Sequence, residues 1–167
     1  MTLSPSTPEL ILADAAADAE ANAVHSSTAA IAGHPLHPAL VPLPIGLLTA
    51  AAASDVAHLV TGDAFYARMS RWLIRGGLVS GLMAAAMGLL DFSTIRAARG
   101  PVGIAHAGGN TAIMGLSALS LVLRRSSRNR VPTLAMLLSA AAALLLAGTG
   151  WLGGELAFRK RIGVPRR

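Results

Sequence analysis

The stretch LIRGGLVSGLMAAAMGLLDFSTI, residues 73–95, has the length and composition of a helix that crosses a membrane. A helix needs roughly 20 mostly apolar residues to cross the hydrocarbon core of a bilayer. Small residues recur every three or four positions along the stretch and lead to a carboxylate: Gly77, Gly81, Ala84, Gly88 and Asp91. This spacing places them on one helix face, where small side chains let a neighbouring helix approach closely. We therefore predict a packed membrane helix with a carboxylate near its end.

Three further apolar runs of similar length cover about residues 38–60, 104–123 and 132–152. The separators are short and polar: TGDAFYARMSRW, RAARGPVG and RRSSRNRV. Short connections make neighbouring helices antiparallel. The sequence therefore predicts an all-α, integral-membrane, up-down four-helix bundle over residues 33–164, with both ends of the chain on one side.

The composition supports this class and excludes several others. Hydrophobic residues make up 53% of the chain and charged residues only 13%, more apolar material than one small soluble core needs. The net charge of +6 comes from arginines between the apolar runs, where they meet lipid headgroups, so we expect contact with the bilayer and no nucleic-acid binding. Cysteine is absent, which excludes thiol ligands. Basic residues are equally frequent at the two ends of the bundle, so charge does not predict orientation.

The two ends of the chain differ from the bundle. Residues 1–32 contain Glu9, Asp14, Asp18 and Glu20 but no lysine or arginine, so we expect an acidic, disordered tail and not a secretory signal. Residues 165–167 form a short basic tail.

The stretch GHPLHPALVPLPIG, residues 33–46, introduces polar groups and prolines at the start of the first run. Pro42 and Pro44 should disturb the beginning of that helix. Antiparallel order then places six polar side chains at the same membrane face, here called side A: His34, His37, Asp91, His106, Asn110 and Glu155. Ionisable groups near hydrocarbon are usually functional, so these residues are the candidate site.

The ionisable groups also have structural interpretations. Asp91 could pair with Arg96 or Arg99, and Glu155 with Arg159 one turn later. At the opposite face, side B, we expect Asp55 to be solvated or to pair with Arg75. Trp151 is expected to anchor the bundle at the membrane interface.

Three functions remain open for side A. In the first, His34 or His37 and His106, with Asn110 beside it, hold a single b-type haem. In the second, a transition metal binds His34, His37, His106, Asp91 and Glu155, or these groups pass protons. In the third, the bundle is structural or binds a partner without a cofactor. Recognisable catalytic motifs are absent, so we do not predict an enzyme.

Four motifs resemble a bacterial membrane family, domain of unknown function 2231: GHPLHP, GLLDF, HAGGN and WLGGELAFRKRIGV. They occur in this order between residues 33 and 164. The resemblance implies a four-helix, multi-pass domain in the bacterial inner membrane. Related proteins sometimes carry an appended Rieske-type iron–sulfur domain, which implies a redox partner protein.

Overall fold

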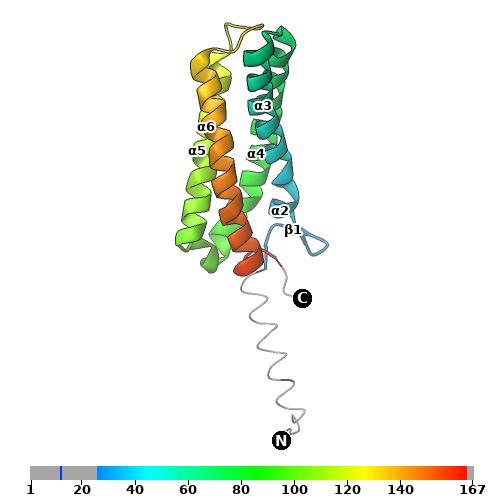
Figure 1. Ribbon diagram of the computed structural model, residues 1–167. Coiled ribbons are helices and arrows are strands. Elements are labelled where there is room, and N and C mark those ends of the chain that lie inside the picture. Colours follow the sequence, from blue (N-terminus) through cyan, green and yellow to red (C-terminus); the bar gives the residue numbers. More distant parts are fainter. Residues whose placement is uncertain (1–11, 13–25, 165–167) are drawn as a thin grey trace, which may run out of the picture.

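Long antiparallel helices side by side make up the body of the computed structural model, which describes Leu12 and residues 26–164. Within these residues the elements are β1 (Ala30–Ile31), β2 (His34–Pro35), α2 (Leu36–Leu40), α3 (Pro42–Thr61), α4 (Ala64–Thr94), η1 (Arg96–Arg99), α5 (Pro101–Leu123), α6 (Thr133–Gly154) and the π-helix η2 (Glu155–Arg159). Helices α3 to α6 run up and down in turn, and both ends of the described chain lie at the same end of the bundle (Figure 1). The all-α four-helix bundle is confirmed. Most of the acidic tail and the basic tail lie outside the described residues.

Local sequence explains where the first two long helices begin and end. Helix α2 ends at Leu40 and Pro42 opens α3, but Val41 between them keeps α-helical backbone angles, so the prolines disturb the start of this helix only slightly. Gly62 ends α3 in the left-handed conformation, which glycine adopts without steric cost. Asp63 then caps α4, because its Oδ1 accepts the N–H of Phe65 at 2.8 Å. This cap starts α4 at Ala64, earlier than the apolar pattern predicts.

Three helical segments in the described chain are long and apolar enough to cross a membrane: Leu36–Thr61, Ala64–Thr94 and Thr133–Arg159. Helix α5 packs beside α6 but is not among them. Its first half contains His106, Gly108, Gly109 and Asn110, which lower its mean hydropathy. Many large apolar side chains lie on the outer surface of the bundle, including Leu144 at 77% exposure and Trp151 at 79%. Such a surface is typical of contact with lipid.

The small-residue stripe of α4 faces other helices, as predicted. A Cβ on Gly77 would lie 2.5 Å from Leu48 of α3, and one on Gly81 would lie 2.7 Å from the sulfur of Met114 of α5. Real Cβ atoms do not approach that closely, so a larger residue would displace Leu48 or Met114 and strain the packing between the helices. The stripe is therefore a packing surface inside the bundle.

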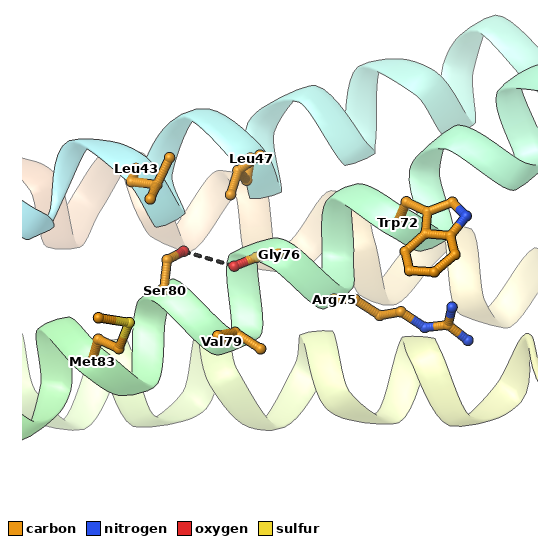
Figure 2. A pocket seen from close by; sticks show the side chains of 8 residues that line it. All are labelled: Leu43, Leu47, Trp72, Arg75, Gly76, Val79, Ser80 and Met83. Carbon is orange, nitrogen blue, oxygen red and sulfur yellow. Dashed lines mark hydrogen bonds between the residues drawn. The ribbon is translucent and has the colours of Figure 1, made fainter.

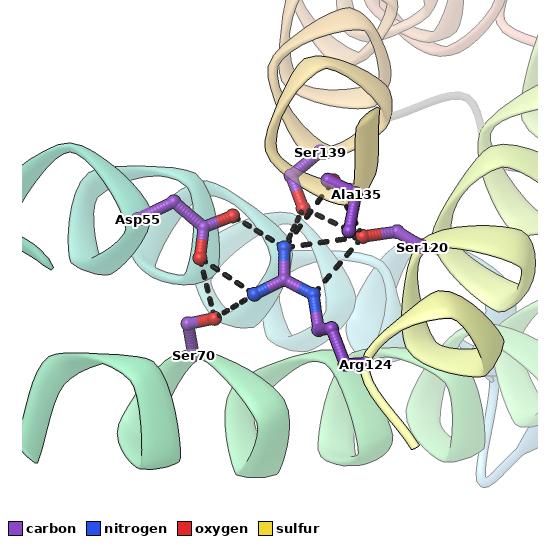
Figure 3. A network of polar contacts seen from close by, with 6 residues as sticks. All are labelled: Asp55, Ser70, Ser120, Arg124, Ala135 and Ser139. Carbon is purple, nitrogen blue, oxygen red and sulfur yellow. Dashed lines mark hydrogen bonds and ion pairs between the residues drawn. The ribbon is translucent and has the colours of Figure 1, made fainter. Parts of the chain in front are cut away.

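A buried ion pair joins all four long helices near side B (Figure 3). Arg124, which follows α5, donates from Nη1 and Nη2 to Asp55 of α3, at 2.7 and 2.6 Å. Both side chains are 1% exposed. The remaining donors of the guanidinium reach Ser70 of α4, Ser120 of α5, and Ser139 and the Ala135 carbonyl of α6.

This network corrects the prediction for Asp55. The expected partner was Arg75 or water, and that expectation is wrong, because Asp55 is buried and paired with Arg124. A buried charge requires an opposite charge and further hydrogen bonds, and Ser70 supplies one more at 2.6 Å. Sequence reasoning assigned Arg124 to the polar connection, since it is the first residue after the apolar run.

Candidate functional site

His37 lies at the side A end of the bundle and faces α4. Its Nδ1 is 2.8 Å from the carbonyl oxygen of Ala84. A Cβ on Gly88, one turn further along α4, would lie 2.8 Å from the imidazole ring. The end of the small-residue stripe therefore makes the space that the His37 ring fills.

His106 is held in the same way between α5 and α6. Its Nδ1 is 2.9 Å from the carbonyl oxygen of Thr149, and a Cβ on Gly153 would lie 3.0 Å from its Cε1. Asn110, one turn along α5, places its Nδ2 3.2 Å from Nε2 of His106 and 2.9 Å from the His106 carbonyl oxygen. Glycine again provides the room, and a backbone carbonyl orients the ring.

These two histidines face each other across the bundle. Their ring centroids are 6.3 Å apart and the ring planes are nearly perpendicular, at 86°. A carbonyl oxygen only accepts hydrogen bonds, so each Nδ1 must carry a hydrogen. In the neutral imidazoles both Nε2 atoms then carry a lone pair, the state in which a histidine binds a metal.

His34 does not join this pair. It is exposed and its Nδ1 is 3.0 Å from the carbonyl oxygen of Ala32, in the turn between β1 and β2. Of the two histidines that the sequence offered as alternatives, His37 is the one beside His106.

Asp91 is buried, but its partners come from the segment that precedes the bundle. Ser27 Oγ donates to both carboxylate oxygens at 2.8 and 2.9 Å, and the Thr28 N–H donates to Oδ1 at 3.0 Å. The expected pairing with Arg96 or Arg99 is not observed. Arg99 instead donates to backbone carbonyls at the end of α4.

Glu155 pairs with Arg159 at 2.9 Å, as the sequence predicted for residues one turn apart. Among the residues that the structure describes, no three or more His, Asp or Glu side chains lie close enough to share a metal ion. The expected convergence on side A is therefore limited to His37, His106 and Asn110. Asp91 and Glu155 bind other partners, and the sequence alone does not show which partner each carboxylate binds.

Sequence reasoning missed the parts that orient the two rings. Gly88 was assigned to the packing stripe and Gly153 to a family motif, whereas both make room for an imidazole. The oriented backbone carbonyls leave no signal in the sequence. A signal for Asp91 did exist, because Ser26, Ser27 and Thr28 form a short run of hydroxyl residues directly before the bundle.

The family comparison agrees with this architecture. A family model described as "Predicted membrane protein (DUF2231)" matches residues 33–166, which include all four long helices and the histidine pair. Comparisons with curated proteins and with solved structures found no match.

Proposed function

Because the chain belongs to the DUF2231 family of predicted membrane proteins, we propose that it is a bacterial inner-membrane protein that carries electrons. In this proposal His37 and His106 hold one b-type haem on side A. The observation that carries it is the pair of facing imidazoles, each with Nδ1 bonded to a backbone carbonyl, which leaves a lone pair on each Nε2 in the neutral rings. Such orienting bonds are typical of histidines that bind metals.

The number of ligands favours haem over a bare metal ion. Structural zinc sites use four protein ligands and catalytic sites use three, whereas haem iron needs axial ligands only. The two ring centroids are 6.3 Å apart, so His37 and His106 are the residues that would hold a haem between them.

The residues of the chain have distinct parts in this proposal. Ala84 and Thr149 fix the ring orientations through their carbonyls. Asn110 reaches Nε2 of His106, the atom that would bind iron, so its amide must release that nitrogen while it keeps its bond to the His106 carbonyl. When bound, haem supplies reversible one-electron transfer, and a redox partner protein would exchange the electron.

Proton transfer is the second candidate, and the close approach of the two imidazoles favours it. An imidazole can take up a proton without any metal, and His37 is the neighbouring ring of His106. Uptake at Nε2 of His106 requires the Asn110 amide to turn away, because its N–H donates to that nitrogen. In the remaining alternative, the two histidines only connect helices, His37 to α4 and His106 to α6.

A visible spectrum and a metal analysis of detergent-purified protein, expressed with haem supplied, test these candidates. We expect a Soret band that is lost in His37→Ala and in His106→Ala, because each removes one axial ligand. His34→Ala and His58→Ala are matched controls, since His34 is exposed, His58 is half-buried at the other end of the bundle, and each ring bonds a nearby backbone carbonyl. These two variants should keep the band.

Other outcomes reject the haem proposal. Bound zinc, iron or manganese without a Soret band, lost on substitution of His106, would favour a metal site. Absence of both the band and the metal from the wild-type protein would leave the proton and structural candidates. A band that survives both alanine substitutions would place haem elsewhere.

A further inference from the structure

A basic cleft lies at the side B end of α4, distant from the histidine pair. It has a volume of about 310 Å³ and is lined by Arg68, Arg71, Trp72, Arg75 and Arg128. Four of these five residues carry a guanidinium group, and no carboxylate belongs to the lining. The cleft is therefore built to receive an anion.

Neighbouring groups leave the charge of the cleft largely uncompensated. Of the nearby acids, Asp55 is paired with Arg124 and Asp63 caps α4. Arg71 donates to the Ser127 carbonyl, but its buried Nε has no hydrogen-bond partner among the described residues. A buried donor without a partner is costly, so a group that accepts a hydrogen bond there would be favourable.

An apolar groove of about 460 Å³ continues from the cleft between α3 and α4 (Figure 2). Its walls include Leu43 and Leu47 of α3, and Val79 and Met83 of α4. Val79 is 62% exposed and Met83 55% exposed, so these side chains are open to the surroundings of the bundle.

Trp72 and Arg75 line both the cleft and the groove. The Arg75 guanidinium carbon lies 4.6 Å from the Trp72 ring centroid, a cation–π contact that holds the two side chains together. Amphipathic pairs of this kind are typical of the level where headgroups meet acyl chains.

The length of α4 supports this depth. Its 31 residues extend about 46 Å, more than the roughly 30 Å of hydrocarbon. The segment from Arg75 to Asp91 extends only about 24 Å at the α-helical rise, less than the hydrocarbon thickness, so the long Arg75 side chain must reach outward to place its guanidinium at the headgroup level. The cleft then lies among headgroups and the groove among acyl chains.

We propose that the cleft and the groove together bind one anionic phospholipid. The phosphate accepts hydrogen bonds from the guanidinium groups that line the cleft, and an acyl chain lies in the groove. A free phosphate would satisfy the arginines but would leave the groove uncovered. The glycerol backbone of the lipid lies beside Trp72 and Arg75, where the cleft meets the groove.

Native mass spectrometry and thermal unfolding of the full chain in detergent, titrated with phosphatidylglycerol or phosphatidylcholine, test the proposal. We expect phosphatidylglycerol to remain bound and to raise the melting temperature, and phosphatidylcholine to do neither. The double variant Arg75→Gln/Arg128→Gln changes two exposed residues and should weaken binding about 25-fold, from roughly 5-fold for each arginine near an anionic group. The matched control is Arg125→Gln/Arg130→Gln, which removes the same charge at the same end but outside the cleft.

The groove has its own test. Val79→Trp should fill it and weaken binding of phosphatidylglycerol, while glycerol phosphate should show little affinity for either protein. Equal losses of lipid affinity in the two double variants would show that binding depends only on the net charge at this end of the bundle, and would overturn the proposal. Inorganic phosphate that competes as well as the lipid, or Val79→Trp without effect on lipid binding, would show a free-anion site and would also overturn it.

Discussion

Replacing Arg124 with glutamine should lower the free energy of unfolding by about 3–5 kcal/mol, the usual cost of removing one partner of a buried ion pair. The substitution leaves Asp55 as an unpaired charge that is 1% exposed. It also removes the charged donors that Arg124 gives to Ser120 and Ser139. The effect should therefore lie toward the upper part of that range.

Unfolding of the purified protein in mixed micelles, with sodium dodecyl sulfate as denaturant, measures this loss. Arg159→Gln is the control, because its ion pair with Glu155 is exposed on the arginine side and should contribute at most about 1 kcal/mol. In a double-mutant cycle, the double variant Asp55→Ala/Arg124→Ala should lose less stability than the two single variants lose together, because neither charge then remains unpaired. If Arg124→Gln were no more destabilising than Arg159→Gln, the reasoning about the buried network would be refuted.

Three other predictions concern packing and topology. Gly81→Leu should lower the melting temperature in detergent, because the added side chain meets Met114. Gly115→Leu is the control and should have little effect, because a Cβ there meets nothing within 4 Å. Equal melting temperatures of the two variants would place the stripe against lipid. Asp91→Ala should lower the free energy of unfolding by about 2 kcal/mol and speed proteolysis at residues 27–29, because it removes charge-assisted hydrogen bonds to Ser27 and Thr28. Unchanged digestion would show that other contacts hold this segment. Reporter fusions at the two ends of the chain should report the same side of the membrane, and opposite sides would mean that the number of spanning helices is odd.

The sequence predicted the helices well because their signals are local. Each apolar run has the length of a span and the connections are too short for anything but antiparallel neighbours. The start of α4 was placed too late because arginines in its first turns were taken as part of the connection. The cap at Asp63 extends the helix through them.

The candidate site was predicted only in part. Connectivity fixes the depth of a residue but not its direction around the helix axis. His34 and His37 have similar depth, yet the turn between β1 and β2 leaves His34 exposed while α2 turns His37 towards α4. The partner of Asp91 was missed for a different reason, since Ser27 and Thr28 were assigned to a separate tail.

The Asp55–Arg124 pair also has a consequence for the order of assembly during synthesis. The hairpin of α3 and α4 contains Asp55 and Ser70, whereas the hairpin of α5 and α6 carries Ser120 and Ser139 with Arg124 at its bend. Translation completes the first hairpin while its carboxylate still lacks a counter-charge. Neither half is electrically satisfied alone, and their charges are complementary, so docking of the second hairpin neutralises the first and fixes which faces of the two halves meet.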